Sequence, residues 1–211
     1  MMLLRYALCA VIAYLLGNFT TGVYVTKWFS NLDIRKVGSG NPGTTNVLRT
    51  LGWLPSALTL LGDVLKGLLG GWIGYWIAGE MGARIGGAFA VAGHNWPVFA
   101  KFKGGKGIAA SLGAILAIEP WFGLGCVVVE AVVVILTRYV SLASICAAIF
   151  YFAITCICRW GEWWSIAFAG ILTAMALISH RSNIQRLLAG NENRLDFHKI
   201  NQLSKNRKKK K

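Results

Sequence analysis

Residues 54–78, LPSALTLLGDVLKGLLGGWIGYWIA, decide the fold. The only charged side chains in this stretch are Asp63 and Lys66, which stand three residues apart. A helix needs about 20 predominantly apolar residues to cross the hydrocarbon core of a bilayer. We therefore expect this stretch to span a membrane. Because charges inside a bilayer are costly, Asp63 and Lys66 are expected either to form a structural ion pair or to serve a function.

Further apolar segments on both sides of this stretch give an expected total of about seven transmembrane helices in an all-α integral membrane protein. These segments cover residues 3–25, 82–98, 108–118, 121–137, 139–158 and 163–179. A short turn at residues 79–80 separates the span 54–78 from the next one. An alternative count of five spans follows if 82–98 and 108–118 are re-entrant. The 55% of apolar residues in the whole chain supports a membrane protein in either case.

The distribution of charge predicts the orientation of these spans. The net charge is +14, and the basic residues lie between and after the apolar segments instead of along one polar face, so nucleic acid is not an expected partner. If the spans alternate in direction, the loops 26–53 and 99–107 and the segment from residue 180 share the most basic face. The positive-inside rule then places the N-terminus outside and the C-terminus in the cytoplasm.

The domain organisation is expected to be simple. Residues 1–202 form a single polytopic membrane domain, and residues 203–211 form a lysine-rich cytoplasmic tail. This tail is expected to be disordered and to lie near anionic lipid headgroups.

The loop before residue 54 has an unusual composition. Residues 38–49 read GSGNPGTTNVLR and concentrate glycine, hydroxyl and amide side chains beside an arginine. Glycine lets a backbone approach a ligand closely, and the arginine guanidinium matches a phosphate. We expect an anion-binding loop, with a Gly/Pro turn as the bland alternative. The pattern Gly38-x-Gly40-x-x-Gly43 formally matches a dinucleotide fingerprint, but no βαβ unit surrounds it, so no nucleotide cofactor is expected.

Two more polar motifs fall on the same expected face. Residues 93–107 read GHNWPVFAKFKGGKG, where Lys106 stands between glycines and Gly107 occupies the place of the magnesium-binding hydroxyl of a Walker A loop. Residues 180–187 read HRSNIQRL, which would place His180 and Asn183 on one helix face. The first motif could be an interfacial turn with snorkelling lysines, and the second the polar cap of a membrane helix.

Together, the three motifs resemble the PlsY family, the bacterial integral-membrane acyl-phosphate:glycerol-3-phosphate acyltransferases. The matching residues lie in 33–49, 93–107 and 180–192, and the stretch 63–67 also looks like the second helix of that family. At 17–22 the chain reads GNFTTG, where the family more often carries Ser-Ile-Pro before the second glycine.

The resemblance implies transfer of a fatty acyl group from acyl phosphate to the 1-hydroxyl of glycerol 3-phosphate. The products would be lysophosphatidic acid and inorganic phosphate, in the first acylation of phospholipid biosynthesis. It also implies a multi-pass protein of the bacterial inner membrane whose active site faces the cytoplasm. An enzyme that forms acyl phosphate would act upstream. The resemblance further implies that no dedicated protein base is used, because the phosphate of the acyl donor takes the hydroxyl proton. No cofactor and no metal are expected.

The residues expected to carry this chemistry come from all three motifs. The expected catalytic residues are Ser39, Arg49, Lys106, His180 and Asn183. The expected substrate- and phosphate-binding residues are Gly38, Gly40, Asn41, Thr45, Asn46, Gly104, Gly105 and Gly107. A membrane transporter for a phosphorylated solute is the alternative function, against which stands the lack of an apparent inverted repeat in the sequence.

Overall fold

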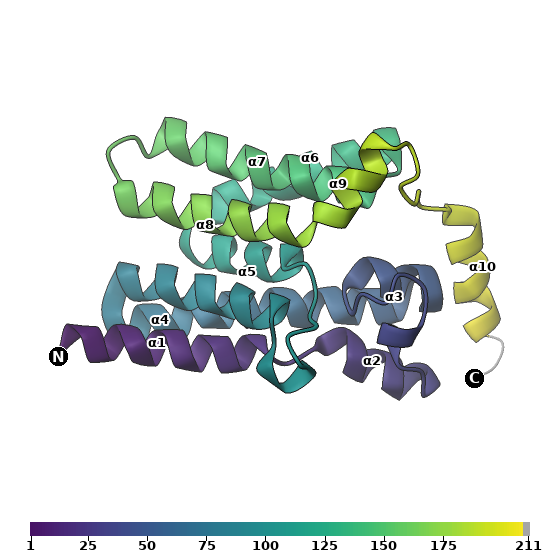
Figure 1. Ribbon diagram of the computed structural model, residues 1–211, viewed down its shortest axis with the longest axis horizontal. Coiled ribbons are helices and arrows are strands. Elements are labelled where there is room, and N and C mark those ends of the chain that lie inside the picture. The colour runs from purple at the N-terminus through teal and green to yellow at the C-terminus, as the bar shows by residue number, and fades with distance from the viewer. Residues whose placement is uncertain (209–211) are drawn as a thin grey trace.

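The computed structural model describes residues 1–208, and every regular element within them is helical (Figure 1). The elements are α1 (Met2–Gly17), α2 (Thr21–Ser30), η1 (Ile34–Lys36), α3 (Thr44–Leu51), α4 (Trp53–Asn95), η2 (Val98–Ala100), α5 (Ile108–Ile118), α6 (Pro120–Thr137), α7 (Val140–Cys158), α8 (Trp163–Ser179), α9 (Arg181–Leu188) and α10 (Phe197–Lys208). The expected all-α class is therefore confirmed.

Helix α4 is a hairpin of two antiparallel limbs. Its backbone leaves the helical conformation at Ala78 and Gly79, and Gly79 has a φ of 64°, which glycine adopts at little cost. The predicted turn at 79–80 is thus confirmed to within one residue. Glycines line the seam between the limbs, because a Cβ at Gly86 would overlap the carbonyl oxygen of Gly70.

Two other glycines of the first limb of α4, Gly67 and Gly71, face α5. A Cβ at Gly67 would overlap the carbonyl oxygen of Ala110 in α5, and one at Gly71 would lie 2.7 Å from the Cβ of Ala117. The small side chains of the segment 54–78 therefore serve close helix packing on two faces.

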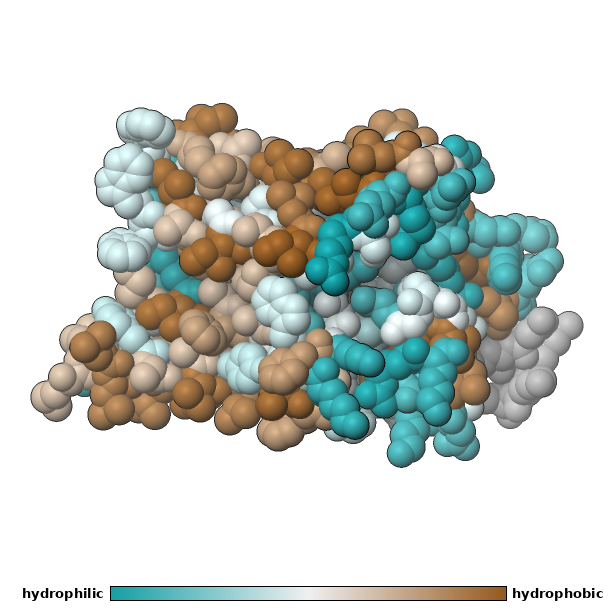
Figure 2. Space-filling view, in the orientation of Figure 1, coloured by the Kyte–Doolittle hydropathy of each residue, from teal (hydrophilic) through white to brown (hydrophobic). Residues whose placement is uncertain are grey.

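The helices form two layers with α5 between them (Figure 1). α1 and both limbs of α4 make one layer, and α6, α7 and α8 make the other. The largest apolar core lies among α5 to α8, around Ile115, Tyr151, Phe168 and Leu172. The short helices α2, α3, α9 and α10 gather at the end opposite the N-terminus, and hydrophilic side chains cluster there on the face shown in Figure 2.

Four helical segments of the described chain are long and apolar enough to cross a membrane. They are Met2–Ser30, Trp53–Ala100, Pro120–Thr137 and Val140–Cys158. A fifth appears if α8 and α9, which meet at a bend of 61°, count as one broken span. This total is below the expected seven, because the second and third expected spans lie in one folded helix and α5 has only 11 residues.

The beginning and the end of the chain each differ from expectation. The first expected span, 3–25, is interrupted at residues 18–20, where α1 ends and α2 begins. At the other end, the expected disordered tail 203–211 is helical as far as Lys208 in α10, and Ser204 within it contacts the start of α4. Residues 209–211 lie outside the described residues.

The seam of α4 makes a stability prediction. Substitution Gly86→Ala places a methyl group against the Gly70 carbonyl, and we expect it to lower the free energy of unfolding by about 1–3 kcal/mol, as overpacking does. Gly170→Ala in α8 is the matched control, because its Cβ would lie 3.5 Å from the Phe152 ring, an ordinary contact. Thermal unfolding in detergent compares the two variants, and equal midpoints would contradict the packing role of Gly86.

Candidate active site

The first motif is folded around the side chain of Asn46. Its Oδ1 accepts a hydrogen bond from the backbone N–H of Ser39 at 3.0 Å, and its Nδ2 donates to the carbonyl oxygens of Val37 at 2.9 Å and Asn41 at 3.0 Å. Asn46 is 3% exposed. This amide therefore holds the loop 37–41 against the first turn of α3. Asn46 therefore positions the loop. Both polar atoms of its side chain are already hydrogen-bonded, which disfavours the direct phosphate contact expected from the sequence.

Glycine is required in the same loop for backbone geometry. Gly38 and Gly40 have φ values of 62° and 72°, which side chains with a Cβ rarely adopt. A Cβ at Gly38 would also overlap Oδ1 of Asn46. Ser39 between them is exposed, so its hydroxyl group is open to solvent or a ligand.

A chain of hydrogen bonds joins the second motif to the third. Lys106 Nζ donates to Asn183 Oδ1 at 2.5 Å, and Asn183 Nδ2 donates to Glu192 Oε1 at 2.8 Å. The other carboxylate oxygen of Glu192, Oε2, accepts from Arg186 Nε at 2.8 Å. Asn183 and Glu192 are buried, at 4% and 8% exposure. The second and third motifs therefore meet at Lys106 and Asn183, and Glu192 anchors both motifs.

Arg49 reaches the same cluster from α3. Its Nη2 donates to the backbone carbonyl of Asn193 at 2.9 Å, next to Glu192. Its Nε is buried and has no hydrogen-bond partner among the described residues. A buried unpaired donor is costly. The Nε is therefore a donor that no side chain or carbonyl of the described residues satisfies, and an anionic ligand could supply its acceptor.

The surroundings of Lys106 lower the pKa of its ammonium group. Burial is the main cause, the charges of Arg186 and Arg49 add to it, and Glu192 opposes it, so that the pKa of Lys106 is lowered to about 8. Burial also lowers the pKa of Arg49. Three cations and one carboxylate leave the cluster with excess positive charge, which an anionic ligand would neutralise.

His180 follows the last residue of α8 and is 2% exposed. Its Nδ1 lies 2.8 Å from the carbonyl oxygen of Ala176, and because a carbonyl only accepts, Nδ1 carries the proton and Nε2 is an acceptor. Burial, followed by the positive charge of Lys106, lowers the pKa of His180 to about 4. A neutral imidazole of such low basicity suits hydrogen bonding better than proton abstraction.

A buried cluster of Asp63, Lys66 and His94 adjoins the second motif, to which His94 belongs. Lys66 Nζ lies 2.8 Å from Asp63 Oδ1 and donates to the Phe19 carbonyl at 2.9 Å, and His94 Nδ1 lies 3.4 Å from the same carboxylate oxygen. The structural ion pair considered for Asp63 and Lys66 is thus confirmed, and it extends to His94. The cluster also joins the break between α1 and α2 to α4.

His94 in turn explains the glycines before Lys106. The Gly105 N–H donates to the His94 carbonyl at 3.0 Å, and a Cβ at Gly104 or Gly105 would overlap His94. Gly107 has a φ of 79° and packs on Asn95. These glycines are thus required by packing and backbone geometry, and their contact with a phosphate stays a prediction.

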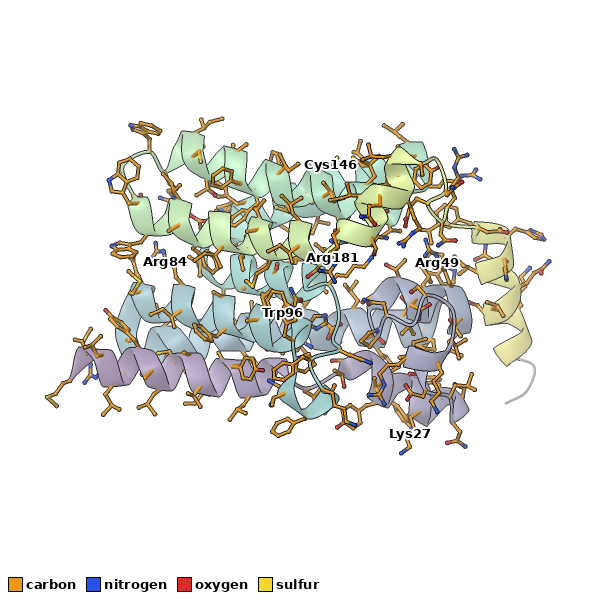
Figure 3. The ribbon with its side chains drawn as sticks, in the orientation of Figure 1. Lys27, Arg49, Arg84, Trp96, Cys146 and Arg181 are labelled. Atoms are coloured by element: carbon orange, nitrogen blue, oxygen red, sulfur yellow. The ribbon has the colours of Figure 1, made fainter. Side chains whose placement is uncertain are left out.

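A polar pocket opens where these elements meet. Four of the predicted residues line it: Asn41, Gly104, Gly105 and Lys106. Side chains from the junction of α8 and α9, Ser179, Arg181 and Ser182, form the opposite wall. Figure 3 shows Arg181 near Trp96, which lines the same pocket, and Arg49 further toward α10. Asn183 lies beside this pocket through its bond to Lys106, and His180 stands between the lining residues Ser179 and Arg181. Arg49 does not line this pocket.

The structure brings to the site several residues that were not among the expected catalytic or binding residues. Arg181, Arg186 and Glu192 lie within or just after the third motif, but their roles depend on contacts that spacing does not reveal. Ser39 and Thr45 stay predictions, because no side-chain hydrogen bond within the described residues joins them to the cluster. Among residues 1–208, no group of three or more His, Cys, Asp or Glu side chains could hold a metal ion.

Comparison with known proteins agrees with this geometry. The model of the glycerol-3-phosphate acyltransferase family matches residues 7–190. The chain belongs to this family. A glycerol-3-phosphate acyltransferase of Thermoanaerobacter sp. strain X514 is 46% identical over 188 residues, which are 89% of this chain and 94% of the relative. The enzyme of the same name from Clostridioides difficile strain 630 is 44% identical and covers 92% and 98% of the two chains.

Solved structures give the same result. The crystal structure of PlsY, an integral membrane glycerol 3-phosphate acyltransferase, in its glycerol 3-phosphate form matches with a TM-score of 0.86 at 36% identity, over 92% of this chain and 98% of the other. Its lysophosphatidic acid form matches with a TM-score of 0.83 at 35% identity, over 92% and 97%. The present chain is accordingly an integral membrane acyltransferase with several apolar helices. A role in phospholipid biosynthesis follows from its family.

The Glu192 carboxylate gives a prediction for stability. We expect Glu192→Gln to lower the free energy of unfolding by about 1.5–3 kcal/mol, because it removes charged hydrogen bonds to Asn183 and Arg186. Although burial raises it, these bonds hold the pKa of Glu192 below its ordinary 4.5. The stabilisation is therefore complete above pH 4.5 and is lost as the pH falls through the folded-state pKa.

The control for this prediction is Glu80→Gln, because the Glu80 side chain is 81% exposed and pairs only with Arg84 among the described residues. Its unfolding free energy should change by less than about 0.5 kcal/mol. Thermal unfolding at several pH values compares the variants, and equal stability of both at pH 7 would contradict the anchoring role of Glu192.

Proposed function

We propose that the protein transfers a fatty acyl group from acyl phosphate to the 1-hydroxyl of glycerol 3-phosphate. The products are lysophosphatidic acid and inorganic phosphate. The observation that carries the proposal is the 2.5 Å bond between Lys106 and Asn183, which joins two motifs beside Arg49 in one cationic cluster. Both substrates bring a phosphate to this cluster, and the excess positive charge suits two anions.

The reaction needs no covalent enzyme intermediate. The hydroxyl oxygen of glycerol 3-phosphate attacks the acyl carbon, the bond from that carbon to the phosphate oxygen breaks, and the hydroxyl proton leaves with the phosphate. Lys106 and Arg49 stabilise the departing phosphate by charge. His180 accepts a hydrogen bond through Nε2 and orients glycerol 3-phosphate together with Asn183. Holding both reactants in place lowers the activation free energy by about 7–11 kcal/mol.

An apolar pocket among α5, α6, α7 and α8 supports an acylated substrate. It extends from Ile108, two residues after Lys106, to Tyr151, and Ala147 and Leu172 form part of its wall. Ala176 of α8 also lines this pocket, and its carbonyl oxygen accepts a hydrogen bond from His180 Nδ1. The part of the acyl chain next to the reacting carbon would lie in this pocket, and the remainder would extend into the bilayer.

The membrane arrangement follows from the same assignment. We propose seven passes, with the two limbs of α4 and the short α5 counted separately, the N-terminus outside and the active site facing the cytoplasm of a bacterial inner membrane. The positions of the polar elements at one end and the N-terminus at the other support this orientation (Figure 1). An enzyme that forms acyl phosphate would supply the donor.

The donor is tested with purified protein, labelled glycerol 3-phosphate and a choice of acyl donors. We expect lysophosphatidic acid to form from palmitoyl phosphate and not from palmitoyl-coenzyme A. In Arg49→Ala and in Lys106→Ala, turnover should fall at least about 100-fold, the size of losing one charge-stabilising donor at the reacting centre. Near-normal turnover in both variants would contradict the assignment of these residues.

The pH dependence tests Lys106 separately. With a pKa of about 8, Lys106 is protonated below pH 8 and loses its charge above it, so kcat/KM should fall about tenfold per pH unit on the alkaline side. Lys106→Arg keeps its charge to much higher pH, because the guanidinium does not deprotonate in proteins. Its alkaline limb should therefore move up. An unchanged limb would show that another group titrates there.

The acyl pocket is tested by filling it. We expect Ala147→Phe to raise the KM for palmitoyl phosphate about tenfold, since a bulky group in this space costs on the order of 1–3 kcal/mol, while the KM for glycerol 3-phosphate stays the same. Val128→Phe is the matched control, because Val128 in α6 is 61% exposed. Equal KM values for palmitoyl phosphate in the two variants would place the acyl chain elsewhere.

A further inference from the structure

The segment 191–204 packs against α3, the helix that carries Arg49. The match to the family model ends at residue 190, so all of this segment lies beyond it. Asn193 binds the Arg49 guanidinium through its backbone carbonyl at 2.9 Å. Two residues on, the Leu195 N–H donates to the carbonyl of Arg138 at 2.8 Å, which ties the segment to the turn between α6 and α7.

Apolar side chains bring α10 onto α3. Leu195 and Ile200 are 5% and 2% exposed and form a buried cluster with Leu48, which precedes Arg49. Helix α3 has only eight residues, and helices of that length are not stable by themselves. Its orientation therefore depends on its contacts, which include the loop held by Asn46, the apolar cluster around Ile34, the first limb of α4 and α10.

Several contacts of α10 are made with the junction between α3 and α4. The first N–H groups of a helix have no partner inside the helix, and the N-cap of α4 is Gly52, which has no side chain to supply one. Ser204 Oγ accepts from the Trp53 N–H at 3.2 Å and takes the place of a cap. Gly52 has a φ of 84°, and a Cβ there would overlap this hydroxyl.

The indole of Trp53 adds two more contacts to α10. Its Nε1 donates to Asn201 Oδ1 at 2.9 Å. Its ring stacks on Phe197, with centroids 6.4 Å apart and an interplanar angle of 7°. The residue that starts α4 is thus held by its backbone, its indole N–H and its ring face.

We propose that α10 is a clasp that positions Arg49 for phosphate binding, with Asn201 and Ser204 as positioning residues. The clasp fixes the junction at Gly52 and Trp53, three residues after Arg49, while Asn193 fixes the guanidinium itself. Opening the clasp frees α3 to move away from Lys106 and Asn183. The inference rests on the proposed role of Arg49, and it names a part of the protein outside the three motifs.

The test opens the clasp and measures phosphate binding. The double variant Asn201→Ala/Ser204→Ala removes both acceptors of Trp53, and we expect it to weaken binding of inorganic phosphate about three- to tenfold, which corresponds to one or two net hydrogen bonds. The KM for a phosphate substrate should rise by the same factor, with kcat within about twofold. Asn201→Asp keeps an acceptor for Nε1 and should bind phosphate like the wild type.

Two controls separate positioning from stability. Gln202→Ala changes an exposed side chain of α10 that bonds only to His198 within the described residues, and it should leave phosphate binding unchanged. In an Arg49→Ala background, the clasp substitutions should have no further effect on phosphate binding, because they act through Arg49. Unchanged binding in the double variant, or an equal effect with and without Arg49, would overturn the clasp.

The two proposals fail in different ways. A clasp variant with unaltered phosphate affinity, in a protein that uses acyl phosphate, refutes the clasp alone. A wild-type protein without acyl-phosphate-dependent transfer, whose phosphate affinity still falls when the clasp opens, refutes the proposed reaction alone.

Discussion

The hydrogen bond from Lys106 to Asn183 is the interaction on which the site depends. It brings a half-buried ammonium group to a buried amide, and the other end of the same amide donates to the carboxylate of Glu192. A buried charge is tolerated only when it is paired and hydrogen-bonded. Other contacts of the site support this bond. The His94 carbonyl fixes the loop before Lys106, and Arg186 donates to the second carboxylate oxygen of Glu192.

Glycine has the same physical role throughout the molecule. At Gly86 it lets two helix limbs touch, at Gly105 it lets a loop lie on His94, and at Gly52 it admits a hydroxyl from α10. At each of these positions a Cβ would overlap an atom of the neighbouring segment. The glycine-rich motifs that indicate a phosphate-binding loop are therefore also packing motifs, and the close packing places the cations of the site.

Much of the fold could be predicted from the sequence, because apolar length and charge distribution are local properties. They identified the segment 54–78, its turn at Gly79 and the meeting of three motifs at one end. The break after Gly17 and the helix that contains Ser204 were not predicted. The sequence around Ser204 is polar and basic, and its order depends on a distant partner, Trp53. For the same reason the functions of Asn46 and Glu192 could not be assigned without their contacts.

The most direct measurement is the rate of phosphate release from palmitoyl phosphate by the purified protein, with and without glycerol 3-phosphate. Direct transfer predicts that release requires glycerol 3-phosphate and equals the lysophosphatidic acid formed, mole for mole. Equal release in the absence of glycerol 3-phosphate would indicate hydrolysis instead of transfer. The absence of both phosphate release and lysophosphatidic acid when the two substrates are present would contradict acyl phosphate as the donor.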